Sequence, residues 1–243
     1  MTAARALLIS SLRSGKVLQM RRCGFSTKLW WLAALCCLVY ATMWVGWARG
    51  WGWLAAADTA TLDVGHRMGL EHHGWVTFWD VWCTVFSPVT LRIVTAGLIF
   101  YAFATRQVRT AIFLIVSVEL SAVLTEVAKR LADRPRPDTA MVDALSTSFP
   151  SGHAVGTMVA VPALAVVLLP HVRREYRRWA VAAGVVVIVL VGVGRIALNV
   201  HHLSDVIAGW ALGYLYLVAC LPILRARRVT AADETPATLD TGR

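Results

Sequence analysis

The stretch from Trp179 to Leu224, WAVAAGVVVIVLVGVGRIALNVHHLSDVIAGWALGYLYLVACLPIL, contains two apolar runs separated by one short polar segment. A membrane-spanning helix needs about 20 mostly apolar residues, and each run is long enough to supply one. The polar segment between them, Arg195 to Asp205, is then expected at a membrane surface, between two antiparallel spans. The stretch therefore predicts an all-α membrane protein.

The composition of the whole chain agrees with this fold class. Hydrophobic residues make up 58% of the chain and charged residues 16%, and the mean hydropathy is +0.61, whereas a soluble globule is about 45–50% apolar and about 25% charged. A net charge of +10 could indicate a nucleic-acid partner, but the basic residues cluster at the ends of apolar runs, where membrane topology explains them. We therefore expect a lipid bilayer, and no nucleic acid, as the partner. The sequence does not indicate an oligomeric state.

Four further apolar runs complete a predicted bundle of six transmembrane helices. The six candidate spans are roughly Leu29–Ala48, Pro88–Thr105, Thr110–Val127, His153–Leu169, Trp179–Leu198 and Val206–Leu224. This predicts one membrane domain over residues 29–224, preceded by a basic tail (1–28) and followed by a polar tail (225–243). The basic tail fits either an amphipathic helix on an anionic leaflet or a disordered segment, and the polar tail is predicted to be disordered.

The segment from Gly50 to Ser87, between the first two spans, contains tryptophans at positions 75, 79 and 82. This spacing places them on one face of a helix. We predict an amphipathic helix that lies in the membrane interface. The alternative is that the tryptophan face packs against the bundle.

The distribution of Lys and Arg predicts the orientation of the bundle. With both termini in the cytoplasm, the cytoplasmic tails and loops contain two thirds of the 24 Lys and Arg residues. Most of the basic residues left outside belong to three polar motifs, which are KRLADRPRP (129–137), PSGH (150–153) and RIALNVHHLSD (195–205). Since cytoplasmic loops are enriched in Lys and Arg, we expect a multi-pass protein of the cell membrane with all three motifs on the extracytoplasmic face.

The motifs contain the groups that hold a phosphate. Lys129, Arg136 and Arg195 supply positive charge, and arginine offers a planar fork to two oxygens. Ser151 and Gly152 precede the fourth span, where the start of a helix presents backbone N–H groups to an anion. We therefore predict a phosphate-binding site formed by these five residues.

The motifs also contain the groups for nucleophilic attack on phosphorus. His201 and Asp205 are four residues apart, so at the start of the sixth span they would share one face of the helix. Asp205 would then accept the Nδ1 proton of His201 and leave Nε2 to attack. His153 would protonate the leaving oxygen and later accept a proton from water.

The three motifs, in this order, resemble the signature of the type 2 phosphatidic acid phosphatase (PAP2) superfamily. The resemblance covers about residues 129 to 209 together with the six-helix layout. It implies the same roles for His201, Asp205 and His153, and it implies that no metal or other cofactor is required. Three cations in one site would also repel a metal ion. One departure is Gly194, because family members often have Ser immediately before the Arg of the third motif.

Several polar residues outside these roles have ordinary interpretations. Arg130 and Arg134 fit a charged loop balanced by Asp133 and Asp138, and Glu126 is spaced to pair with Lys129 or Arg130. His202 is expected to pack or to contact substrate. Glu119, within the third span, has no partner that the sequence identifies. His66, His72 and His73 fit exposed loops.

These observations predict a membrane-embedded lipid phosphate or pyrophosphate phosphatase. The substrates that the resemblance suggests are undecaprenyl pyrophosphate, phosphatidylglycerol phosphate and phosphatidic acid. One alternative is a phosphotransferase that passes the phosphate to an acceptor hydroxyl. Another is a non-catalytic membrane protein that binds lipid phosphates. The sequence does not identify the headgroup or the tail length.

Overall fold

The computed structural model describes residues 27–144 and 146–225, and its regular structure in this range is entirely helical. The predicted tails, 1–28 and 225–243, fall almost wholly outside the described residues. Along the chain the elements are α2 (Thr27–Ala48), α3 (Gly52–Glu71), α4 (His73–Val85), α5 (Pro88–Ala104), α6 (Val108–Leu114), the π-helix η1 (Ile115–Glu119), α7 (Ser121–Ala132), α8 (Gly152–Leu168), the 3-10 turn η2 (Leu169–His171), α9 (Arg174–Ala197), α10 (Leu203–Cys220) and α11 (Pro222–Arg225).

Within the described residues, six helical segments are long and apolar enough to cross a membrane, which confirms the predicted number of spans. They are Thr27–Ala48, His73–Ala104, Val108–Ala132, Gly152–His171, Arg174–Ala197 and Leu203–Leu224. Large apolar side chains cover their outer surface, and Trp31, Ile93 and Phe100 are 73%, 69% and 77% exposed. A soluble monomer seldom exposes such large apolar patches, so this surface fits contact with lipid.

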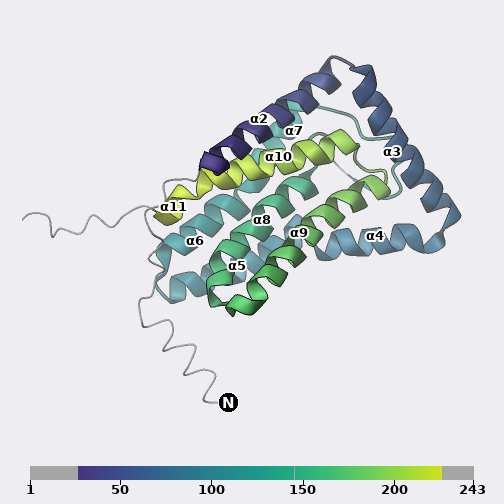
Figure 1. Cartoon of the computed structure of the whole chain (residues 1–243). Helices are drawn as coiled ribbons and strands as arrows, with labels where there is room; N and C mark the ends of the chain where they lie inside the picture. Colours follow the sequence, from purple (N-terminus) through teal and green to yellow (C-terminus); the bar gives the residue numbers. More distant parts are fainter. Residues whose placement is uncertain (1–26, 145, 226–243) are drawn as a thin grey trace, which may run out of the picture.

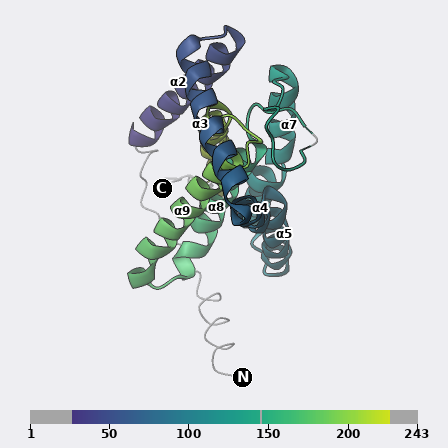
Figure 2. The same cartoon turned by 90° about the vertical axis from the view of Figure 1, so that its right-hand side faces the viewer.

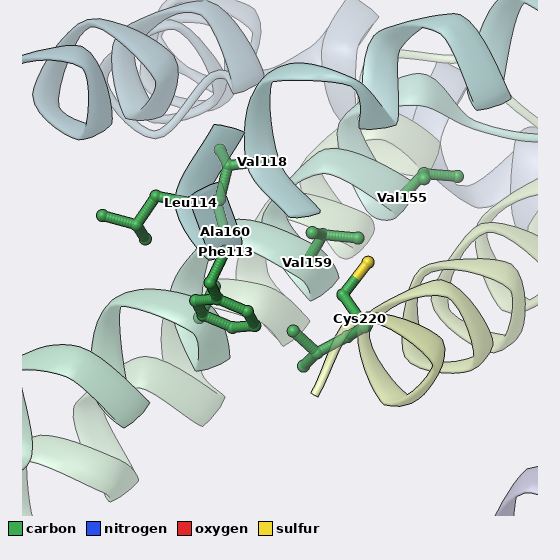
Figure 3. Close-up of a cluster of buried hydrophobic side chains, with 9 residues drawn as sticks. Phe113, Leu114, Val118, Val155, Val159, Ala160 and Cys220 are labelled. Atoms are coloured by element: carbon green, nitrogen blue, oxygen red, sulfur yellow. The ribbon is translucent and has the colours of Figure 1, made fainter. Parts of the chain in front are cut away.

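Helix α8 lies at the centre of the bundle, packed between α9 and α10, and α2 runs along the other side of α10 (Figure 1). The core beside α8 is formed by apolar side chains of α6, η1, α8 and α10, including Phe113, Val118 and Val159 (Figure 3). Gly209 and Gly213 of α10 face α8, and a Cβ added at Gly209 would lie 2.7 Å from the Cβ of Ala154. Small residues at this spacing let two helix backbones approach closely.

Helices α3 and α4 lie outside this bundle core, and α3 crosses the ends of α9 and α10 (Figures 1 and 2). The tryptophan face of α4 packs against the end of α9 and the loop after it. Trp79 is 8% exposed and belongs to a buried cluster with Leu198 and Val200, and Trp75 Nε1 donates to the carbonyl of Ala197 (3.1 Å). The prediction that these tryptophans face the membrane interface was therefore wrong, and the alternative of packing on the bundle is correct.

Two residues with left-handed backbone conformation follow the ends of α7 and α9. They turn the chain into the loops of the first and the third motif. Asp133 (φ 47°) closes α7, and its N–H donates to the carbonyl of Lys129 (2.8 Å). Asn199 (φ 53°) turns the chain between α9 and α10. Its side-chain Nδ2 donates to the carbonyl of Leu62 in α3 (3.0 Å) and to Thr139 Oγ1 (2.9 Å). Asn and Asp are among the few residues that adopt this conformation readily, so both turns are locally encoded.

Candidate active site

The three motifs meet at one end of the bundle, at the C-terminal ends of α7 and α9 and the N-terminal ends of α8 and α10. A cavity of about 720 Å³ lies between them. Six of the predicted site residues line it, namely Lys129, Arg136, Gly152, His153, Arg195 and His201. Asp80, Thr84 and Ser87 of the α4–α5 region and Asp143 of the loop before α8 complete much of the wall.

The cationic wall of the cavity is held by backbone carbonyls. Lys129 is 6% exposed, and its Nζ donates to the carbonyl of Thr147. Arg136 donates from Nε to the carbonyl of Ser146 (2.6 Å) and from Nη1 to the carbonyl of Val200 (2.7 Å). These contacts fix both cations before any ligand binds.

Arg136 and Arg195 keep donor capacity for an anion. Burial, and secondarily the charge of Arg195, lower the pKa of Arg136 to about 10, so the guanidinium stays charged at neutral pH. Arg195 is 7% exposed, and its buried Nε has no hydrogen-bond partner among the described residues. A buried, unpaired donor is costly, and an anion in the cavity would relieve that cost.

His201 is 1% exposed and lies in the loop before α10, which begins at Leu203. The expectation that His201 and Asp205 share the first turn of the sixth span was therefore wrong, because the helix starts two residues later. His201 Nε2 lies 3.3 Å from Arg136 Nη1. Since a guanidinium only donates, this contact favours the tautomer with the proton on Nδ1.

Ser148 lies between His201 and Asp205. The direct distance from His201 Nδ1 to Asp205 Oδ2 is 3.6 Å, whereas Ser148 Oγ is 3.4 Å from Nδ1 and donates to Oδ2. The serine hydroxyl can accept from Nδ1–H while it donates to the carboxylate. Ser148 is fully buried, and the sequence analysis did not identify it.

Burial is the main cause that lowers the pKa of His201, to about 3, and the hydrogen bond to Asp205 opposes the shift. Ordinary histidine titrates near pH 6.5. The imidazole is therefore neutral at physiological pH, and its unprotonated Nε2 accepts a hydrogen bond from Arg136 Nη1 while no ligand is bound.

Asp205 is fully buried and accepts several hydrogen bonds. Oδ1 accepts from Arg134 Nη1 (2.7 Å), and Oδ2 accepts from the backbone N–H of His202 (2.9 Å). His202 is the N-cap of α10 and Asp205 its third residue, so the two form a capping box. His202 therefore has a capping role, in place of the packing or substrate contact expected from the sequence.

Ser151 and Gly152 differ in their relation to the cavity. Ser151 is fully buried and does not line the cavity, and its N–H donates to the carbonyl of Asp205 (3.0 Å). That N–H is not available to a phosphate, contrary to the expectation from the sequence. Gly152 begins α8 and lines the cavity. The first helical hydrogen bond is Val155 N–H to Ser151 C=O, so the first turn of α8 presents its earlier N–H groups at the cavity.

Arg134 was interpreted from the sequence as part of a charged loop, and the structure contradicts this. Arg134 is 6% exposed and pairs with Asp58 of α3 (2.8 Å) and with Asp205 (2.7 Å). By contrast, Arg130 is exposed and pairs with Glu126 (2.8 Å), as predicted. The signal that could have distinguished the two arginines is helical spacing, since only Arg130 has a local partner at i−4.

Comparisons with known proteins identify sequences and a fold that are similar to this chain. Residues 110–228 match the family model described as the PAP2 superfamily. A phosphatidylglycerophosphatase B of Bacillus subtilis is 35% identical over 127 residues, which cover 51% of this chain and 60% of that protein. An undecaprenyl-diphosphatase of Sulfolobus acidocaldarius is 34% identical over 127 residues, which cover 49% of this chain and 56% of that protein. Both alignments span less than two thirds of the relative's length.

The fold is also similar to a solved structure. The crystal structure of the first transmembrane PAP2 type phosphatidylglycerolphosphate phosphatase from Bacillus subtilis superposes with a TM-score of 0.68. The sequences are 24% identical, and the match covers 82% of this chain and 100% of that chain. At this identity the likeness shows a common fold.

Proposed function

We propose that this chain, whose residues 110–228 match the PAP2 superfamily model, is a membrane-embedded phosphatase of lipid phosphates or pyrophosphates that works through a phosphohistidine on His201. The observation that carries the proposal is the cavity itself. Residues from three distant segments line it together, with a cationic wall and a buried neutral imidazole. Lys129, Arg136 and Arg195 would hold the phosphate oxygens and stabilise the charge of the transition state.

In the proposed first step, His201 Nε2 attacks phosphorus, and the bond from phosphorus to the lipid oxygen breaks. His153, which lines the same cavity, enters this step as the imidazolium, a form that the bound phosphate favours, and becomes neutral as it gives its proton to that oxygen. Positive charge then develops on the imidazole of His201, and Nδ1–H faces Ser148 and the Asp205 carboxylate behind it. Arg136, whose Nη1 lies near Nε2, would move its hydrogen bond to a phosphate oxygen as the substrate enters.

In the proposed second step, His153 takes a proton from water, and the water oxygen attacks phosphorus. The bond from phosphorus to Nε2 breaks, which releases inorganic phosphate and restores neutral His201. These proton movements use only side chains that line the cavity, and the sequence-based expectation that no metal takes part is kept in the proposal.

We propose that the cavity opens on the extracytoplasmic face, because two thirds of the Lys and Arg residues then lie on the cytoplasmic side. The named relatives suggest phosphatidylglycerophosphate-like and undecaprenyl-diphosphate-like substrates. Asp80 and Asp143 line the same cavity. Carboxylates accept hydrogen bonds from hydroxyls and repel a phosphate joined directly to the first, which favours a terminal phosphate monoester on a glycerol headgroup over a pyrophosphate.

Phosphate release by the purified protein in detergent, with EDTA present, tests the proposal. The panel contains phosphatidylglycerophosphate, undecaprenyl pyrophosphate and phosphatidic acid. We expect release that is fastest on phosphatidylglycerophosphate, is lost in His201→Ala, and is retained in His73→Ala, a control at an exposed histidine. Activity in His201→Ala would refute the mechanism. Release that requires an added acceptor alcohol would indicate phosphotransfer, and binding without any release would indicate a non-catalytic lipid-binding protein.

A further inference from the structure

A buried charge network reaches from Asp205, behind the cavity, to α3. Arg134 contacts Asp205 Oδ1 through Nη1 (2.7 Å) and Asp58 Oδ2 through Nη2 (2.8 Å). The exposed fractions of Arg134, Asp58 and Asp205 are 6%, 3% and 0%. One guanidinium therefore joins two carboxylates in a place that water barely reaches.

Asp58 also holds the residue that precedes Asp205 in the chain. Its Oδ1 accepts from the backbone N–H of Ser204 (2.9 Å), and its Oδ2 accepts from Ser204 Oγ (2.7 Å). Ser204 Oγ in turn accepts from Arg134 Nη1 (2.7 Å). Both oxygens of Asp58 are thus committed to groups that contact or adjoin Asp205.

The formal charges of this network leave one negative charge unbalanced. With Asp58 and Asp205 ionised and Arg134 protonated, two carboxylates share a single guanidinium. Without Asp58, Arg134 would neutralise Asp205 alone. In a buried site such interactions are weakly screened, so the second carboxylate preserves the negative charge that Asp205 directs toward His201.

Such a network is not an efficient way to stabilise a fold. Removing charges from water costs several kcal/mol per ion, and well-packed apolar residues are often as stabilising as a buried ion pair. The network is nevertheless closely enclosed, with Trp47 of α2 lying 5.7 Å from the guanidinium carbon of Arg134. This favours a role in the reaction.

We infer that Asp58 is a positioning residue for the proposed phosphatase reaction. Through Arg134 and Ser204 it holds the Asp205 carboxylate and keeps its negative charge available to His201. Positive charge grows on His201 as the bond between nitrogen and phosphorus forms, so Asp58 acts mainly on the chemical step. The inference rests on the proposed function and extends the active site to α3, a helix outside residues 110–228.

Asp58→Asn tests this inference, with Asp63→Asn as the matched control, since Asp63 is an exposed aspartate of the same helix. We expect kcat for phosphate release to fall by roughly 10- to 100-fold in Asp58→Asn, as for other misplacements of catalytic groups. We expect KM to stay unchanged because the cationic wall of the cavity is intact. Asp63→Asn should keep both parameters. A folded Asp58→Asn protein with the wild-type kcat, or with a loss confined to KM, would overturn the inference.

A double variant separates action through Asp205 from general damage. If Asp58 acts through Asp205, Asp58→Asn combined with Asp205→Asn should be no slower than Asp205→Asn alone, whereas losses that multiply would refute the inference.

Should Asp58→Asn fail to fold, Arg134→Lys replaces it, because lysine keeps the charge but cannot reach both carboxylates as a fork. The same kcat loss and the same non-additivity are expected, and their absence would refute the inference. A wild-type protein inactive on every lipid would refute the proposed function, whereas an active wild type with an unaffected Asp58→Asn would refute this inference alone.

Discussion

At the scale of single residues, the proposed mechanism requires that His201 is neutral, so that its imidazole can attack phosphorus. Because burial lowers the pKa of His201 to about 3, the folded protein should keep this imidazole neutral as the pH falls from 8 to 5, while ordinary histidines become protonated near pH 6.5. ¹⁵N NMR of histidine-labelled protein in detergent checks this, with His201→Gln identifying the signal. A His201 signal that titrates near pH 6.5 would contradict the prediction.

Ser148 offers a second test at this scale, because its hydroxyl connects Nδ1 of His201 to Asp205. Ser148→Ala leaves the imidazole 3.6 Å from the carboxylate without the bridging group. We expect kcat to fall by about 10-fold or more, since hydrogen bonds to charged groups contribute about 1.5–3 kcal/mol. Ser146→Ala is the control in the kinetic assay, because Ser146 is exposed and holds Arg136 mainly through its backbone carbonyl. An equal loss in both variants would argue against the bridge.

Residues in the motifs could be predicted from the sequence because their chemistry and spacing are local. Asp58 could not, since it pairs with Arg134 across 76 positions of the chain. The sequence also cannot distinguish a charged loop residue that faces water from one that pairs with a buried partner. This is why Arg134 was predicted to belong to an exposed charged loop. The prediction that His201 and Asp205 share the first turn of a helix was wrong because the Asp205 carboxylate forms the N-terminal cap with His202. The helix therefore begins after His201.

At the scale of elements, the contact between α8 and α10 sets the geometry of the site. Gly209 permits it, and a Cβ there would lie 2.9 Å from the carbonyl of Ser151, the residue whose N–H is bonded to Asp205. We expect Gly209→Val to lower the melting temperature and to abolish most phosphate release, since overpacking costs about 1–3 kcal/mol. Gly97→Val in α5 is the control, because a Cβ at Gly97 has no atom within 4 Å. Unchanged activity in Gly209→Val would show that the two helices can separate without harm.

The elements themselves were the most predictable level of this protein. A helix in lipid must satisfy its backbone internally and present apolar side chains, so each span leaves a long apolar run in the sequence. The ends were less predictable. The third span extends from Val108 to Ala132, beyond the predicted Thr110–Val127, because Lys129 belongs to the last turn of α7 and is buried at the cavity. The π-helical turn η1 inside that span has no signature in the apolar pattern.

At the scale of the whole molecule, the charge distribution predicts which face contains the cavity. The segment that joins η2 to the first turns of α9 (residues 172–178, the arginine-rich segment) contains four arginines, at positions 173, 174, 177 and 178, and lies at the opposite end of the bundle from the motifs. Lys and Arg near spans are retained on the cytoplasmic side. Asp143, at the cavity, and Glu175, in the arginine-rich segment, are both exposed, so a label at each position reports one face.

The test introduces Asp143→Cys or Glu175→Cys into a variant whose five native cysteines are replaced by alanine. A membrane-impermeant maleimide should label Asp143→Cys in intact spheroplasts and Glu175→Cys only after lysis. The opposite pattern would place the cavity in the cytoplasm, and the substrate would then have to be a lipid phosphate of the inner leaflet. Because the proposed phosphate-binding residues and the arginine-rich segment lie at opposite ends of the same helices, this single result fixes the leaflet from which the proposed phosphatase would take its lipid.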